Sequence, residues 1–358
     1  MKKCIFCLLW LFNFQLVLCQ TRNCNPDPSG KPWTVSTVDI GVDDFCTRTE
    51  FIPTDISLQT PLAESVHNED EIWWPFIINQ YAYNSCTQVA EVFYTYTYEV
   101  NRKLNTDAGD GITVPVFSDR NFNQHYTYNQ ALASDNGSAG YTTGFCMIRE
   151  NGCPNYLDFD DYALHHGVPN GYLYWMTGSE KYLSGMQHRV SEIYQFTIGP
   201  TAASLINLKH WLNDHGRGET SGGLAIIGVW IDGATTTEIT QGPYTGEYLL
   251  NFANQYTGEH ALTIVGYDNN FPVSATELGA FKIANSWGTD ANFGNEGFAW
   301  LPYSALVSGN LNIALPYAYT CDIYPTETFP INPPDISIFA NIEHNNRSQL
   351  IIMLGTMK

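Results

Sequence analysis

Cys86 stands where a thiol can act as a nucleophile. It follows Asn84 and Ser85, either of which can cap a helix. After it, apolar residues recur at steps of three and four positions: Val89, Val92, Phe93, Tyr96, Val100 and Leu104. This spacing predicts a buried helix that begins at Cys86. The thiolate is the attacking form of cysteine, and both a helix N-terminus and a nearby imidazolium stabilise it.

A base for this thiol must come from elsewhere in the chain, and His260 is the best-placed histidine. It opens the run from His260 to Asp268, which predicts a strand with the histidine at its exposed end. Asn285 ends another predicted strand, and its amide can hold the imidazole in one orientation. Cys86, His260 and Asn285 together supply a nucleophile, a base and a group that orients the base.

The elements that must position these residues differ between the two halves of the chain. Helical patterning returns at 156–165 and 203–212. Residues 105–145 interrupt it with Gly, Asn, Asp and Ser, and are interpreted as a long surface insertion. A helix-rich first half and a strand-rich second half predict an α+β protein of two lobes. The predicted strands of the second half are 223–231, 260–267, 279–285 and 297–301.

Three sequence blocks resemble the active-site blocks of papain-like cysteine peptidases. The first runs from Asn79-Gln80 to Asn84-Ser85-Cys86. The second is Glu259-His260-Ala261, followed by Val265-Gly266-Tyr267. The third is Ile283-Ala284-Asn285-Ser286-Trp287-Gly288, followed by Gly294 and Gly297-Phe298. The blocks occur in the order that the family shows, and the resemblance spans about residues 61–315.

The resemblance implies a papain-like two-lobed fold, with a helical lobe, a β-barrel-like lobe and the active site in the cleft between them. Gln80 and the Cys86 backbone N–H would form the oxyanion hole, where one donor lowers the barrier by roughly 3 kcal/mol. Trp287 would shield the hydrogen bond between His260 and Asn285 from water. The implied reaction is hydrolysis of a peptide bond through a Cys86 thioester, with no cofactor and no metal.

The chain departs from the family pattern at three places near this site. Thr87 follows the nucleophile, where the family usually has an aromatic residue. Tyr83 replaces a cysteine that the family bridges to the position of Cys153. Asn155-Tyr156 replaces a Gly-Gly that hydrogen-bonds the substrate backbone. Two alternatives therefore stay open: a catalytically silent papain-like binding domain, and an acyltransferase that uses the same three residues.

Residues 1–19 have the pattern of a signal peptide. Two lysines precede an apolar run from Cys4 to Leu18, which is too short and too interrupted for a membrane span. We therefore expect a secreted protein, in an extracellular, periplasmic or lysosome-like compartment. Such compartments permit disulfides. The expected pairs are Cys146–Cys153 and Cys24–Cys46.

The segments on either side of the papain-like block predict further divisions of the chain. Residues 20–60 are polar and rich in Pro, Thr and Asp, and are interpreted as a short pro-segment or N-terminal arm. The papain-like domain is expected over 61–315. Residues 316–358 are interpreted as a Pro-rich linker followed by the start of a β module.

The charge of the chain argues against nucleic acid as a partner. The chain has 16 Lys and Arg residues and 36 Asp and Glu residues, and the resulting formal net charge of -20 repels phosphate backbones. Histidines outside the three blocks lack the spacing of metal ligands. We expect a protein or peptide substrate, no membrane span and a monomeric protein.

Overall fold

The computed structural model describes residues 8–11, 14–20, 47–81, 83–109, 118–131, 138–159, 179–199, 201–253, 255–289, 293–307, 313–324 and 350–356. The chain divides into two compact units, Met1–Asp44 with Asn332–Lys358, and Phe45–Ile331. The first unit contains a small antiparallel sheet in the order β1-β2-β13. Its strands are β1 (Leu8–Leu11), β2 (Phe14–Gln20) and β13 (Leu350–Thr356). No helix among the described residues is both long and apolar enough to cross a bilayer.

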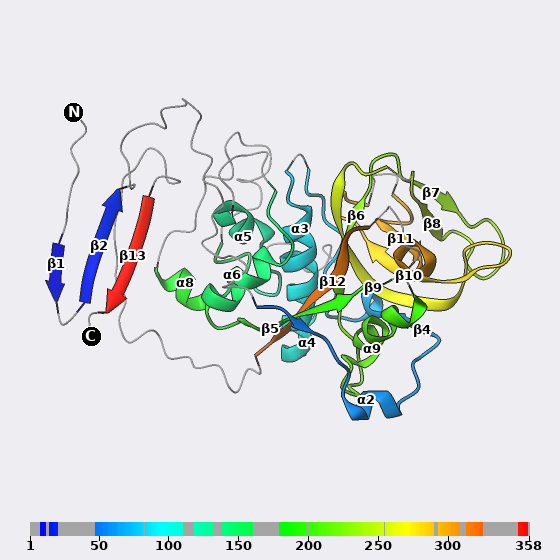
Figure 1. Ribbon diagram of the computed structural model, residues 1–358, viewed down its shortest axis with the longest axis horizontal. Coiled ribbons are helices and arrows are strands. Elements are labelled where there is room, and N and C mark those ends of the chain that lie inside the picture. Colours follow the sequence, from blue (N-terminus) through cyan, green and yellow to red (C-terminus); the bar gives the residue numbers. More distant parts are fainter. Residues whose placement is uncertain are drawn as a thin grey trace. The chain divides into compact units, whose positions relative to one another are not determined.

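One ten-stranded sheet organises the second unit (Figure 1). Its strands are β3 (Thr49–Glu50), β4 (Ser65–His67), β5 (Val190–Thr197), β6 (Ala225–Trp230), β7 (Thr235–Glu238), β8 (Tyr248–Asn251), β9 (Glu259–Pro272), β10 (Leu278–Ala284), β11 (Phe298–Pro302) and β12 (Ile313–Ile323). They pair in the order β3-β5-β12-β6-β9-β10-β11-β8-β7, and β4 pairs with β9. The end strands β3 and β7 lie at opposite ends of this order, so the sheet of the predicted β-barrel-like lobe is open and does not close into a barrel.

The nucleophile helix begins at Cys86, as the apolar spacing predicted. It runs without a break through α3 (Cys86–Gln88), the π-helical segment η2 (Val89–Tyr96) and α4 (Thr97–Leu104). Its apolar stripe is buried from Val89 to Val100. The other helices are α2 (Asp55–Gln59), η1 (Asn68–Asp70), α5 (Gln124–Ala131), α6 (Thr143–Asn151), α8 (Ser179–Gly185), η4 (Ala202–Leu205), α9 (Ile206–Asp214) and α10 (Tyr303–Val307).

The segment interpreted as a surface insertion is largely internal where the structure describes it. Phe122, Tyr126 and Tyr128 are all buried, and Tyr126 packs edge-on against Phe159 at 5.7 Å between ring centroids. Tyr126 and Tyr128 belong to α5, which lies beside the nucleophile helix (Figure 1). The polar residues that surround these aromatic side chains in the sequence gave no sign of their burial. The helix predicted at 156–165 is wrong for 156–159, which form turns, and the remainder lies outside the described residues.

The sheet continues past the predicted domain boundary at residue 315. Strand β12 crosses that boundary and pairs with β5 on one side and β6 on the other. Pro316, which suggested a linker, lies at an irregularity in the pairing with β6, where a residue without an N–H is tolerated. Its carbonyl accepts a hydrogen bond from the Ile198 N–H at 2.8 Å.

The predicted disulfide between Cys146 and Cys153 is wrong, because Cys153 is a buried free thiol. It packs in the apolar cluster that also contains Cys321, another free thiol. Burial raises the pKa of both thiols well above the ordinary value, so neither is a competing nucleophile. The predicted Cys24–Cys46 pair lies outside the described residues.

The N-terminal arm is built into the folded unit from residue 49 onward. Strand β3 pairs in parallel with β5, and the buried Phe51 ring lies 5.2 Å from the rings of Tyr194, Phe196 and Trp211. The buried hydroxyl of Ser57 donates a hydrogen bond to the Asp214 carboxylate at 2.9 Å. These contacts make residues 49–57 part of the folded unit.

Replacement of Phe51 with alanine tests this arrangement. We expect Phe51→Ala to lower the free energy of unfolding by about 3–5 kcal/mol, because it leaves a cavity among three aromatic rings. Ile52→Ala is the matched control, since Ile52 is 75% exposed and its loss should change stability by less than about 0.5 kcal/mol. Urea denaturation of both variants measures the difference. Equal, small effects would show that the arm does not contribute to the folded unit.

Candidate active site

Cys86 and His260 both line a cavity of about 510 Å³. One wall comes from the segment before the nucleophile helix, with Gln80 and Tyr83. The opposite wall comes from the sheet and the loop after β10, with Glu259 and Trp287. The remaining described lining residues are Tyr81, Asn84, Ser138, Ile231 and Gly258. The structure thus brings together side chains that lie in distant parts of the sequence.

The environment of the Cys86 sulfur favours its ionised form. Burial is the largest single influence and raises the pKa of this thiol, but four smaller influences, led by a hydrogen bond and the charge of His260, together outweigh it. The Ala261 backbone N–H and the Thr87 hydroxyl also contact the sulfur, and Thr87 Oγ1 lies 4.0 Å away. The net result is a thiol pKa below the ordinary value. Thr87, the departure from the family pattern, therefore contributes a polar contact to the nucleophile.

The imidazole of His260 is held in one tautomer by Asn285. His260 Nε2 lies 2.8 Å from Asn285 Oδ1, which also accepts the Ser286 backbone N–H at 2.7 Å. Because an amide oxygen only accepts hydrogen bonds, Nε2 must carry a proton. The other ring nitrogen, Nδ1, is then the one available to Cys86. Both His260 and Asn285 are buried, which restricts competition from water.

Trp287 packs against the His260 ring, with 4.7 Å between centroids and planes inclined by 33°. Phe293 supports the indole from another side, edge-on at 5.8 Å. The sequence reasoning assigned Trp287 to shielding the hydrogen bond between His260 and Asn285. Its position over the imidazole is compatible with that assignment.

Gln80 is held beside the thiol by contacts with the segment that contains Asn285. Its backbone N–H donates to the Ser286 carbonyl at 2.7 Å, and its side-chain oxygen accepts the Ser286 hydroxyl. Since the oxygen is occupied in this way, the Nε2 amide group points to the other side, where it donates to the Tyr83 carbonyl at 2.7 Å. That NH2 group carries a second hydrogen, and Gln80 lines the cavity.

Several residues that support this site were not identified from the sequence. The buried Tyr94 hydroxyl donates to the Asn285 carbonyl at 2.9 Å and ties the nucleophile helix to the loop after β10. Ser286 and Ala261 lie inside the recognised blocks but had no assigned role. In contrast, Asn84 or Ser85 was proposed as a helix cap, and the buried Ser85 hydroxyl has no hydrogen-bond partner among the described residues. The backbone geometry at Ser85 starts the helix without a side-chain cap.

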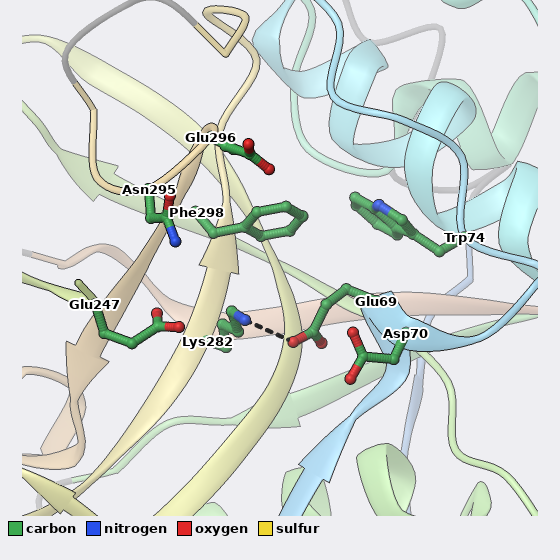
Figure 2. A pocket seen from close by; sticks show the side chains of 8 residues that line it. All are labelled: Glu69, Asp70, Trp74, Glu247, Lys282, Asn295, Glu296 and Phe298. Atoms are coloured by element: carbon green, nitrogen blue, oxygen red, sulfur yellow. Dashed lines mark ion pairs between the residues drawn. The ribbon is translucent and has the colours of Figure 1, made fainter. Parts of the chain in front are cut away.

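A second cavity, of about 260 Å³, contains no thiol among its described lining residues (Figure 2). Lys282 Nζ lies 2.9 Å from Glu69 Oε1, which also contacts His67 Nδ1 at 3.0 Å. His67, Glu69 and Asp70 have ligand atoms within 4.8 Å of one another. The ammonium group of Lys282 already compensates the Glu69 carboxylate, so this cluster is a structural ion-pair network.

No protein-family model and no curated protein sequence matches the chain. Several solved structures are similar to it. Xylellain, a cysteine protease from Xylella fastidiosa, is 16% identical with a TM-score of 0.49, over 77% of this chain and 91% of that chain. Digestive procathepsin L 3 from the larval midgut of Tenebrio molitor is 13% identical with a TM-score of 0.49, over 77% of this chain and 73% of that chain. The bromelain protease from Ananas comosus is 13% identical with a TM-score of 0.46, over 73% of this chain and 99% of that chain.

At identities of 13–16%, the likeness to these structures concerns the fold alone. In this chain a helix that begins with a cysteine packs against an open sheet, and strand β9 of that sheet carries the histidine. The chain has an α+β fold in which the helix that begins at Cys86 and the strand that carries His260 meet at one cavity.

Proposed function

We propose that this protein is a cysteine endopeptidase that hydrolyses peptide bonds through a thioester on Cys86. The observation that carries the proposal is the contact of the Cys86 thiol with an imidazole that Asn285 holds through a hydrogen bond of 2.8 Å. A buried structural cysteine needs neither a lowered pKa nor an oriented base. Both are requirements of a nucleophilic thiol.

The proposed reaction has two steps. The Cys86 thiolate attacks the carbonyl carbon of the substrate, and the oxyanion that forms accepts hydrogen bonds from the Gln80 side-chain amide and the Cys86 N–H. Collapse breaks the C–N bond, and the amine leaves with a proton from His260. A water molecule then gives a proton to His260 and attacks the thioester, which releases the acid and restores the Cys86 thiolate beside protonated His260.

The test is incubation of the protein with a peptide library, followed by mass spectrometry of the products. Protein whose Cys86 has been alkylated beforehand is the control. We expect cleavage by untreated protein and none by alkylated protein. No cleavage of any peptide would contradict the proposal and favour a binding domain. Peptides joined to added amines would instead favour acyl transfer, because water and amines compete for the same thioester.

The cellular setting is part of the same proposal. We infer an exported peptidase, since residues 1–19 have the pattern of a signal peptide. N-terminal sequencing of protein recovered from the culture medium of the producing cell tests both export and the cleavage site. We expect the N-terminus of the recovered protein to lie near residue 20.

A further inference from the structure

The Cys86 cavity has a single carboxylate among its described lining residues, that of Glu259. Glu259 begins β9, directly before His260, and is exposed to solvent. No lysine or arginine is among the described residues of this lining. A positively charged substrate group that reaches this part of the cavity therefore finds a negative partner and no lysine or arginine among the described lining residues.

A second carboxylate, that of Asp232, is exposed and lies beside a residue that lines the cavity. A Cβ atom added to Gly258 would lie 2.0 Å from Asp232 Oδ1, so the carboxylate packs directly on the Gly258 backbone. Gly258 itself lines the cavity. Two backbone hydrogen bonds fix this edge: Ile231 N–H donates to the Gly258 carbonyl at 2.9 Å, and Asp232 N–H to the Thr257 carbonyl at 3.3 Å.

Tyr141 supports Glu259 from the neighbouring side. Its hydroxyl donates to the His260 carbonyl at 3.3 Å and also lies within hydrogen-bonding reach of the Glu259 carboxylate. Gly228 makes room for this ring, since an added Cβ would lie 2.4 Å from the Tyr141 hydroxyl oxygen. The Tyr141 ring also stacks on Tyr319, with 6.3 Å between centroids. Glu259 is thus a positioned carboxylate and not a free surface group.

We propose that Glu259, assisted by Asp232, makes the cleft selective for substrates with a lysine or arginine side chain close to the scissile bond. This inference rests on the proposed function, because it names the substrate class of the Cys86 site. Two carboxylates at one edge of a cleft create a negative potential that attracts cations, and the attraction weakens with salt. A neutral residue at the same substrate position gains nothing from it.

The first test compares matched peptides that carry either lysine or norleucine at each of the two positions on either side of the cleaved bond. We expect kcat/KM to favour lysine by roughly tenfold at low salt at one position. Glu259→Gln should reduce this ratio to between about one and two, and Asp232→Asn should reduce it less. Glu238→Gln is the control, because Glu238 is an exposed carboxylate on β7 and should leave the ratio unchanged. A wild-type ratio near one, or one that survives Glu259→Gln, would overturn the proposal.

A second measurement separates this proposal from the proposed function. A trimethylammonium-bearing methanethiosulfonate and a neutral one both label Cys86, whether or not the protein cleaves peptides. We expect the ratio of cationic to neutral labelling rates, followed by intact mass, to fall several-fold in Glu259→Gln and not in Glu238→Gln. If no peptide is cleaved but this ratio falls, the cation site stands and the peptidase proposal fails. If peptides are cleaved and neither ratio changes, the cation site is refuted and the peptidase proposal stands.

Discussion

His260→Ala is expected to lower kcat/KM for peptide cleavage by roughly 10³–10⁴-fold, because the variant lacks the base and the acid of both steps. The same change should raise the thiol pKa of Cys86. Burial, the largest influence on that pKa, acts to raise it and persists in the variant, whereas the two largest opposing influences both come from His260. The alanine variant therefore retains the effect of burial but loses the two largest influences that oppose it, and keeps only the contacts of Ala261 and Thr87.

The pH dependence of thiol alkylation measures this effect directly. In the wild type the pKa of Cys86 is lowered, so the thiolate is present and reacts at pH values where a model thiol is protonated. Its labelling by iodoacetamide should fall only as the pH decreases through this lowered pKa. In His260→Ala, the labelling rate should increase with pH only at pH values above those at which a model thiol begins to react. His210→Ala is a suitable control, since His210 packs at Ser57 and does not line the cavity. Identical profiles for wild type and His260→Ala would exclude an interaction between the two residues.

Gln80→Ala is expected to lower kcat by about 10²–10³-fold, with a much smaller change in KM. The side-chain amide of Gln80 would stabilise the oxyanion, which exists in the transition state and not in the bound substrate, so the loss falls on kcat. The site is well defined for this purpose, because the Gln80 oxygen is held by Ser286 and the nitrogen faces Tyr83.

A purely structural role for Gln80 would give a different pattern. Alkylation of Cys86 by iodoacetamide passes through no oxyanion, so Gln80→Ala should label at nearly the wild-type rate if the site is intact. Loss of both cleavage and labelling would show that the variant disturbs the thiol. Ser286→Ala, which removes the hydroxyl that orients Gln80, should give an intermediate decrease in kcat with normal labelling.

The sequence alone determined the chemistry-bearing residues and the elements that carry them. The helix at Cys86 and the strands at His260 and Asn285 follow from local patterns of apolar and β-branched residues. Side chains on one face recur about every 3.6 residues in a helix and every two residues in a strand, so a short stretch of sequence is enough to recognise either element. The residue type at each position limits the reaction, so a thiol, an imidazole and an amide in family order predicted a nucleophile, a base and an orienting group.

Only the tertiary structure decided which groups meet and in what state. The tautomer of His260 depends on the contact with Asn285, and the thiol pKa of Cys86 depends on a balance between burial and His260. The burial of Phe51, the free thiol of Cys153 and the internal position of α5 likewise depend on segments that are distant in sequence. Such contacts depend on how whole helices and strands pack against one another. The spacing of apolar residues within one element does not show which other element it will pack against.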